Sequence, residues 1–267
     1  MRGKTALITG ASSGLGRALA AALAKEGVNL ILSGRSEEKL NETENFIKKY
    51  NVSTVIIPAD LTNQDDIKNL IESGCKYFGS IDYLILNAGI SMWSKFEDIK
   101  EPSLFENLIN VNYLGAVYCT FYAIPYLIKS KGLIVAITSI QSKISVPNHT
   151  GYVASKHALY GFFNTLRMEL EDKNVDVLTV LPHWIKGTNL RENALNAFGK
   201  KQEDGLPAHT GESISLEVCT EKIIGGMKKR KKEIIIPFKL KILTWLNVLY
   251  RKLAEKIIKN KTKEQQS

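Results

Sequence analysis

The chain has 267 residues, of which 44% are hydrophobic and 24% charged, and a formal net charge of +9. This length fits one domain with a substantial core, and the sequence shows no internal repeat or low-complexity segment. The three cysteines, Cys75, Cys119 and Cys219, are too widely spaced for a disulfide framework and are expected to be reduced thiols, in the core or at the surface. Neither they nor the four scattered histidines match a metal-binding pattern, so we expect no metal site.

The chain opens with a short apolar strand that runs into the turn Gly10-Ala-Ser-Ser-Gly14-Leu-Gly16 and then into an Ala/Leu-rich helix. The unpaired amides and the helix dipole of such a turn attract phosphate groups. Gly10 permits the tight turn, Gly14 lets the backbone approach a pyrophosphate, and Gly16 allows close helix packing. An ordinary strand-to-helix loop is the alternative. The predicted dinucleotide contacts here are Gly10, Ser12, Ser13, Gly14, Leu15 and Gly16.

Short apolar runs alternate with longer amphipathic stretches as far as residue 237. This alternation predicts an α/β fold, a Rossmann-like doubly wound parallel sheet of about seven strands with helices on both faces. The expected strands are residues 6–9, 30–32, 55–57, 83–86, 134–137, 177–181 and 234–236. We expect a catalytic domain at 1–237 and a helical tail at 238–267. The first strand begins too close to Met1 for a signal peptide, so a cytoplasmic location is expected.

Tyr152 and Lys156 are four residues apart in a stretch, 151–173, whose apolar spacing predicts a helix. The phenol and the ammonium then project side by side, and the cation is expected to lower the tyrosine pKa. Such a tyrosine can exchange a proton with a carbonyl or hydroxyl oxygen. The same spacing also arises by chance, as a partly exposed tyrosine beside a solvated lysine. The glycine turn, and Ser139 thirteen residues before Tyr152, favour the catalytic interpretation.

These motifs follow one another along the chain in the order found in the short-chain dehydrogenase/reductase family. Over about residues 4 to 237 the chain resembles the common single-domain type of that family. The resemblance implies that Asn112, Ser139, Tyr152 and Lys156 form a catalytic tetrad. It further implies that Asp60 meets the adenine and that Asn87-Ala88-Gly89 steadies the central sheet. The implied cofactor contacts beyond the glycine turn are Arg35, Asp60, Leu61, Asn87, Ala88, Gly89, Tyr152, Lys156, Pro182, Ile185 and Thr188.

The reaction that the resemblance implies is hydride transfer between a nicotinamide and a carbonyl or secondary alcohol. Tyr152 would donate a proton to the carbonyl oxygen, and Ser139 would hold that oxygen. Lys156 would lower the tyrosine pKa and bind the nicotinamide ribose, while Asn112 would hold a water that links Lys156 to solvent. Family members commonly pair through the helices after strands four and five, so a homodimer or homotetramer is expected.

The end of the second expected strand bears on the choice of cofactor. An NAD site places a carboxylate there for the ribose 2′-hydroxyl, whereas this chain has Ser33, Gly34 and Arg35. The planar donor fork of arginine suits a 2′-phosphate, and Arg17 supplies a second cation. We therefore expect NADP(H) to be favoured over NAD(H). In the alternative interpretation, both arginines are solvated surface charges.

The segment after the sixth expected strand departs from the family pattern. The family usually has Pro-Gly, whereas this chain has Pro182 followed by His183 and Trp184, and the threonine contact to the nicotinamide shifts to Thr188. His183 and Trp184 either touch the substrate or pack under the following loop. Residues 189–215 are polar and punctuated by glycine, and in this family they form the lid that selects the substrate.

The tail concentrates the positive charge, because residues 228–264 carry thirteen basic and three acidic side chains, a net +10. One amphipathic helix is expected over residues 238–258. It is too polar to span a bilayer but suits an anionic membrane surface. The apolar face would hold Ile242, Trp245, Leu246, Leu249, Tyr250, Leu253 and Ile257, and the polar face Lys241, Thr244, Arg251, Lys252, Glu255 and Lys259.

Two other interpretations of the tail stay open, packing on the protein itself and packing on a second subunit. Nucleic-acid binding is not expected, since aromatic platforms and a recognition fold are missing. A membrane location favours a lipophilic carbonyl or alcohol as substrate, and a soluble 3-oxoacyl thioester is the alternative. The alternative of another class, a non-catalytic NADP-binding scaffold, would not need all four tetrad residues.

Overall fold

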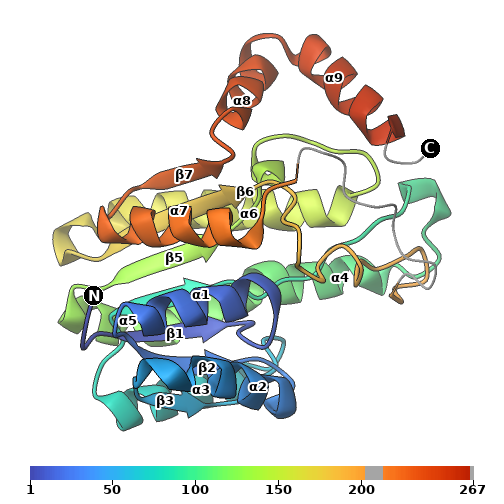
Figure 1. The fold of residues 1–267 in the computed structure, drawn as a ribbon. Coiled ribbons are helices and arrows are strands. Elements are labelled where there is room, and N and C mark those ends of the chain that lie inside the picture. The colour runs from blue at the N-terminus through green and yellow to red at the C-terminus, as the bar shows by residue number, and fades with distance from the viewer. Residues whose placement is uncertain (202–212, 265–267) are drawn as a thin grey trace.

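The computed structural model describes residues 1–201 and 213–264. Within these residues, seven parallel strands form one sheet in the order β3-β2-β1-β4-β5-β6-β7 (Figure 1). The predicted Rossmann-like sheet is confirmed, and every expected strand agrees with its observed bounds to within one residue. The strands are β1 (Thr5–Thr9), β2 (Asn29–Ser33), β3 (Thr54–Ile56), β4 (Tyr83–Leu86), β5 (Leu133–Ile137), β6 (Asp176–Pro182) and β7 (Glu233–Ile236).

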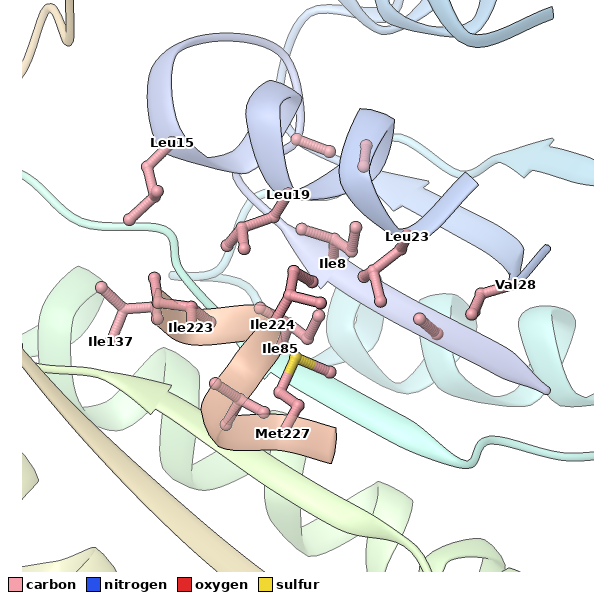
Figure 2. Close-up of a cluster of buried hydrophobic side chains, with 14 of the residues drawn as sticks. Ile8, Leu15, Leu19, Leu23, Val28, Ile85, Ile137, Ile223, Ile224 and Met227 are labelled. Atoms are coloured by element: carbon pink, nitrogen blue, oxygen red, sulfur yellow. The ribbon is translucent and has the colours of Figure 1, made fainter. Parts of the chain in front are cut away.

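Helices cover both faces of the sheet, as the parallel connections require (Figure 1). One face carries α1 (Gly14–Lys25), α2 (Glu37–Ile47) and α7 (Leu216–Lys228). The other carries α3 (Gln64–Phe78), α5 (Gly115–Ser130) and α6 (Thr150–Glu169). In the first of these two core layers α1 and α7 meet over the strands; Figure 2 shows Leu19, Leu23, Ile223, Ile224 and Met227 gathered above Ile8 and Ile85.

Local chemistry sets several helix bounds. The side chain of Ser36 accepts a hydrogen bond from the Lys39 amide and caps the start of α2. Gly79, with a φ of +77°, ends α3 in the left-handed conformation that glycine adopts most readily. The helix expected over 151–173 begins at Thr150 and ends at Glu169, and a short 3-10 turn, Glu171–Lys173, follows it.

The helical run Ser103–Ser130 joins α4 (Ser103–Ile109), a π-helical turn (Asn110–Leu114) and α5. Among the described residues, it is the one helix that is long and apolar enough to cross a membrane. Its inner side chains, however, pack in the core of the protein, Ala116 and Cys119 among them. All three cysteines are buried and unpaired, which places them in the core rather than at the surface.

The tail forms two helices, α8 (Leu240–Leu249) and α9 (Arg251–Glu264), beyond the edge strand β7 (Figure 1). The single helix predicted over residues 238–258 is therefore wrong. Tyr250, with φ −137° and ψ 61°, breaks it, because α9 turns back to bury Ala254 and Ile258 against the body of the protein. Thr244, predicted on the polar face, is also buried.

Candidate functional site

The carboxyl ends of neighbouring strands bring the predicted site residues to one edge of the sheet. Gly10 follows β1, Asn87 follows β4, and Ser139 lies just after β5. Connections leave β1 and β4 toward opposite sides of the sheet, so a crevice opens between these two strands. In doubly wound folds this is where a ligand binds.

The glycine turn is locked to β4 by side-chain hydrogen bonds. The Asn87 carboxamide donates to the carbonyls of Thr9 (3.1 Å) and Gly10 (3.2 Å), while the Thr9 hydroxyl accepts from the amides of Asn87 (3.0 Å) and Ala88 (3.2 Å). A Cβ on Gly16 would lie 2.1 Å from the Gly10 carbonyl oxygen, so only glycine lets α1 approach so closely. The turn is thus held in place at the carboxyl end of β1.

The predicted contacts after β6 lie against the same turn. The Thr188 hydroxyl donates to the Ile185 carbonyl (3.1 Å), and the Thr188 Cβ lies 3.4 Å from where a Cβ on Gly14 would stand. Pro182 ends β6 as a buried residue. Leu15 is also buried and points into the core, as Figure 2 shows. The structure thus brings Thr188 to the glycine turn and places the side chain of Leu15 in the core.

The end of β2 offers groups that remain unpaired. Ser33 is buried, and its hydroxyl has no hydrogen-bond partner. Arg35 is exposed and makes no side-chain hydrogen bond or ion pair within the described part of the chain. The Ser12 hydroxyl lies 3.4 Å from the Cβ position of Gly34, while Ser13 is exposed at the N-cap of α1. An unpaired hydroxyl and an unpaired cation therefore stand at the predicted adenosine end of the site.

The Arg17 side chain is hydrogen-bonded to other groups of the protein. Its guanidinium donates to the Ser12 carbonyl (2.7 Å), to the Thr43 hydroxyl (3.0 Å) and to the Glu42 carboxylate (2.8 Å). These contacts fasten the glycine turn to α2. The role expected for Arg17 as a second free cation fits this arrangement poorly, because its Nε and Nη2 donate to protein groups and its charge is paired with Glu42.

Asp60 and Leu61 follow β3 at the same edge. The Asp60 carboxylate accepts from the amide (2.9 Å) and hydroxyl (2.8 Å) of Thr62, and these hydrogen bonds together with the charge of Arg35 lower its pKa. Leu61 lies so close to Gly115 that a Cβ there would be 2.8 Å from the Leu61 Cβ. The carboxylate is thus held ionised beside Arg35.

Four predicted catalytic side chains come together at the start of α6. Tyr152 and Lys156 are both buried on this helix, and the Ser139 hydroxyl is hydrogen-bonded to the Tyr152 phenol. The Asn112 carboxamide donates to the Ser155 hydroxyl (2.9 Å), which donates in turn to the Tyr152 carbonyl (2.8 Å). The sequence analysis missed Ser155, the residue that links the π-helical turn to α6.

Asn112 is engaged by the backbone of Ile90 as well. Its Oδ1 accepts from the Ile90 amide (2.8 Å), and its Nδ2 donates to the Ile90 carbonyl (2.9 Å). A Cβ on Gly89 would lie 3.2 Å from the Asn112 Oδ1 and 3.6 Å from the Lys156 Nζ, so these three residues are neighbours. The Asn112 carboxamide thus uses three of its four possible hydrogen bonds to hold the backbone of Ile90 and the side chain of Ser155.

The pKa values at this centre differ from the sequence-based expectation. Burial raises the pKa of Tyr152 to about 12, partly opposed by the hydrogen bond with Ser139. Burial lowers the pKa of Lys156 to about 8. The Lys156 ammonium donates to the Ile137 carbonyl (3.1 Å) and lies 5.8 Å from the centre of the Tyr152 ring. The pKa of Tyr152 is thus raised by burial rather than lowered as expected from the sequence, and its phenol is protonated at neutral pH.

Aromatic rings form a wall beside Tyr152. The His149 ring lies 6.2 Å from the Tyr152 ring, 4.8 Å from that of Trp93 and 5.7 Å from that of Trp184, between centroids. Burial lowers the pKa of His149 to about 4, so its imidazole is neutral at pH 7. Of the two interpretations of His183 and Trp184, these contacts favour a place for Trp184 in the site wall. The His183 ring lies 6.2 Å from that of Trp184.

The segment predicted to be a lid contributes a side chain that the sequence did not indicate. Arg191 is buried, with its guanidinium carbon 5.3 Å from the Trp93 ring centre and 5.1 Å from the Trp184 ring centre. It stands in the polar stretch 189–215, where nothing in the local pattern marks it as buried. Part of that predicted lid, residues 202–212, lies outside the described residues.

Comparison with known proteins places this geometry in a family. The family model of the short chain dehydrogenases matches residues 4–197. An "11-beta-hydroxysteroid dehydrogenase-like 3" of Arabidopsis thaliana is 36% identical over 249 residues, covering 92% of this chain and 76% of that protein. An "11-beta-hydroxysteroid dehydrogenase" of Pinus massoniana is 30% identical over 255 residues, covering 94% and 70%.

Solved structures agree on the fold. An alcohol dehydrogenase from the archaeon Thermococcus sibiricus, complexed with 5-hydroxy-NADP, superposes with a TM-score of 0.76 at 25% identity, covering 87% of this chain and 95% of that one. A short chain dehydrogenase/reductase from Burkholderia phymatum, in complex with NAD, has a TM-score of 0.83 at 21% identity, covering 94% and 95%. With the family match over most of its length, the chain belongs to the short-chain dehydrogenase/reductase family of oxidoreductases.

Proposed function

We propose that this protein is an NADP(H)-dependent oxidoreductase that interconverts a carbonyl group and a secondary alcohol on a lipophilic substrate at a membrane surface. The observation that carries the proposal is the convergence of Ser139, Tyr152 and Lys156, with Asn112 behind them, at the carboxyl edge of the sheet. The names of the plant relatives refer to hydroxysteroids, which are lipophilic alcohols, and this supports the substrate class.

The chain's own residues account for the handling of the proton. Tyr152 stays protonated at neutral pH and donates its proton to the carbonyl oxygen of the substrate, while the Ser139 hydroxyl hydrogen-bonds that oxygen and fixes its position. Lys156, with a pKa of about 8, lies 5.8 Å from the centre of the Tyr152 ring and can resupply the phenol with a proton. Asn112 holds the Ile90 backbone and, through Ser155, the start of α6. The nicotinamide, when bound, supplies or accepts the hydride.

The residues at the carboxyl edge of the sheet fit a nicotinamide adenine dinucleotide phosphate. The locked glycine turn presents backbone amides to phosphate groups. The unpaired Ser33 hydroxyl and the exposed Arg35 stand where the ribose 2′-position is expected. The strand lacks the carboxylate that would repel a 2′-phosphate, and the fork of Arg35 suits one, which supports NADP(H) over NAD(H).

The tail supports the membrane location. Seven large apolar side chains on α8, beside it and at the start of α9 are each more than half exposed, and we call them the outer face: Phe238, Ile242, Trp245, Val248, Leu249, Tyr250 and Leu253. Exposed apolar clusters of this kind mark interaction surfaces. Residues of α9 together with Lys95 and Asn148 line a cleft of about 490 Å³ that also holds Lys252, Lys256, Lys259 and Glu255. Apolar anchors beside lysines match an anionic lipid surface.

The other side of the tail packs on the protein, so the membrane and self-packing interpretations describe two faces of one element. Leu240, Leu243 and Ile258 join the cluster around Ile144, and the Asn247 carboxamide donates to the Lys143 carbonyl (3.1 Å). We propose residues 1–237 as the catalytic domain and residues 238–267 as its membrane-facing extension.

A subunit interface fits the helices after β4 and β5. Phe121 on α5 and Met168 on α6 are both about 70% exposed, so these helices have apolar side chains available for contact with a second copy. We propose that these helices pair two copies of the chain into a homodimer or homotetramer. Sedimentation of the full chain measures the state, and Phe121→Glu is expected to shift it toward the monomer.

The test of the reaction is Tyr152→Phe, which keeps the ring and removes the proton donor. We expect NADPH oxidation with a panel of lipophilic ketones to fall by about 100-fold or more, while NADPH binding stays within about twofold of wild type. Tyr77→Phe, at an exposed ring, is the matched control. Retained turnover in Tyr152→Phe would overturn the assignment. Turnover of acyl thioesters alone would favour the soluble-substrate alternative, and binding without turnover would favour a scaffold.

A further inference from the structure

The side chain of Arg191 is buried without a hydrogen-bond partner. It is 4% exposed, and none of Nε, Nη1 and Nη2 has a partner among the described residues. A guanidinium is always charged and carries five N–H donors. Burying these donors without an acceptor is costly, so such a group ordinarily binds something.

The neighbours of Arg191 cannot satisfy it. The Trp93 and Trp184 ring centres are 6.4 Å apart with a 50° tilt, and the guanidinium lies in the notch between them. The ring faces attract the positive charge. The indole N–H groups are donors only, and they cannot accept from Arg191. The two rings therefore leave the guanidinium nitrogens without an acceptor.

The backbone around Arg191 is fixed, so its inward direction is built into the fold. Leu195 pairs with the segment before the aromatic wall, donating to the Ser91 carbonyl (2.9 Å) and accepting from the Trp93 amide (2.9 Å). The Ala194 amide donates to the Arg191 carbonyl (3.0 Å). These bonds hold the start of the 189–201 segment beside the wall.

The wall connects Arg191 to the proposed proton donor. His149 contacts the rings of Trp93, Trp184 and Tyr152. Arg191 and His149 pack against the same two indole rings, and after burial the charge of Arg191 also lowers the pKa of His149. Since His149 is neutral, the cations of this region are Lys156, beside Tyr152, and Arg191, beside the two indole rings. The row of rings that begins at Tyr152 therefore ends at a guanidinium.

We propose that Arg191 binds a carboxylate of the substrate, so that the substrates are lipophilic carbonyl or hydroxy compounds that also carry a carboxylate group. This rests on the proposed function. The planar fork of arginine matches the two oxygens of a carboxylate. One negative charge neutralises one guanidinium, whereas a phosphate dianion would leave net charge buried. Trp93 and Trp184 suit the apolar part of such a molecule. A long-chain oxo acid is the simplest example.

The first experiment compares each oxo acid with its methyl ester in NADPH-coupled turnover. Wild type is expected to favour the acid in kcat/KM. In Arg191→Met this preference should fall by about 10- to 100-fold, mainly through KM, because a charge-assisted hydrogen bond is lost. Arg191→Lys keeps the charge but lacks the planar fork of donors, so its preference for the acid should lie between those of wild type and Arg191→Met. Lys200→Met, an exposed cation on the same segment, should leave the preference unchanged. A series of chain lengths then locates the best spacing between carbonyl and carboxylate.

The second experiment needs no turnover. A saturated carboxylic acid of the best chain length, its amide and the matching alkyl phosphate are titrated against the intrinsic fluorescence of Trp93 and Trp184. The third tryptophan, Trp245, is exposed on α8 and is replaced by Phe in every sample. Binding of the acid is expected to depend on Arg191 and to exceed that of the amide. Tighter binding of the phosphate would overturn the carboxylate assignment.

Thermal unfolding separates a binding role from a structural one. An unpaired buried charge destabilises the free protein, so Arg191→Met should raise Tm by about 2–4 °C or more. A lower Tm in both Arg191 variants, with unchanged acid-to-ester preference in Arg191→Lys, would make Arg191 structural and overturn the proposal. Arg191-dependent carboxylate binding without any turnover would instead leave the site intact and overturn the oxidoreductase function. Equal turnover of esters and acids, unchanged in Arg191→Met, would overturn the carboxylate site and leave the oxidoreductase function intact.

Discussion

The carboxamide of Asn112 donates to the hydroxyl of Ser155 over 2.9 Å, joining the π-helical turn to α6 one residue before Lys156. Asn112→Ala would remove the donor to the Ser155 hydroxyl and leave the backbone N–H and C=O of Ile90 without their side-chain partner. We expect unfolding free energy to fall by roughly 2–3 kcal/mol, and kcat to fall with it, because α6 carries Tyr152. Urea unfolding and steady-state kinetics measure both effects. Asn107→Ala, at an exposed position of α4, should change neither.

Gly16 and Gly161 form a matched pair for one substitution. A Cβ on Gly16 would lie 2.1 Å from the Gly10 carbonyl oxygen, whereas a Cβ on Gly161 would meet nothing within 4 Å. Gly16→Ala should displace the glycine turn and weaken NADPH binding by at least about tenfold. Gly161→Ala should stabilise α6 by about 0.5–1 kcal/mol. Calorimetric cofactor titration and thermal unfolding test the pair, and normal NADPH binding by Gly16→Ala would contradict the account.

The choice of cofactor is expected to depend on Arg35. In Arg35→Asp a carboxylate replaces the cation, so kcat/KM with NADPH should fall by about 10- to 100-fold while that with NADH holds or rises. Lys222→Asp, which makes the same charge change at an exposed position of α7, is the control. Equal losses with both cofactors would place Arg35 outside the phosphate site.

Liposome flotation tests the outer face. The full chain is expected to float with vesicles that contain phosphatidylserine and to float less with neutral vesicles or in high salt. Replacing Ile242, Trp245 and Val248 together by Ser removes anchors that each contribute about 1.5–3 kcal/mol when buried, so binding should fall by more than about 100-fold. Phe46→Ser, at another exposed apolar residue, is the control. Flotation of the triple variant at the wild-type level would exclude this face as the contact.

His149 predicts how stability depends on pH. Its pKa is about 4 in the folded protein, below the ordinary value of 6.5. Between these values the unfolded chain binds a proton that the folded protein does not, so unfolding free energy falls as pH drops from 6.5 to 4. The full difference is roughly 3 kcal/mol. Urea unfolding at pH 7 and pH 4.5 should show a smaller loss for His149→Asn than for wild type. Identical losses would mean that the imidazole protonates within the fold.

The sheet could be predicted because β-strand signals in this chain are local and short. All five residues of β1 and of β5 are buried, so their apolar runs mark them directly. The gathering of Ser139, Tyr152 and Lys156 followed from family motifs. The direction of the Tyr152 pKa shift did not, because it is set by burial, which depends on residues far away in the chain.

Two features of the molecule could not be predicted from the local sequence pattern. The break at Tyr250 arises because α9 finds a partner in the cluster around Ile144, and a helical wheel drawn on the tail alone does not contain that cluster. The burial of Arg191 depends likewise on the rings of Trp93 and Trp184, which are distant in sequence. Charged residues in a polar loop usually face solvent, and here the tertiary fold overrides that rule.

The π-helical turn Asn110–Leu114 has a consequence for the register of the helical run that contains it. Leu104, Leu108, Asn112 and Ala116 are buried at intervals of four residues, and in an uninterrupted α-helix each such step would drift about 40° around the axis. The wider turn, in which the Gly115 amide reaches back five residues to the Asn110 carbonyl, cancels part of that drift. It keeps the buried faces of α4 and α5 on the same side of the helical run. Deleting one residue from the turn would rotate one helix relative to the other, so that either the core contacts of the two helices or the orientation of the Asn112 side chain would be lost.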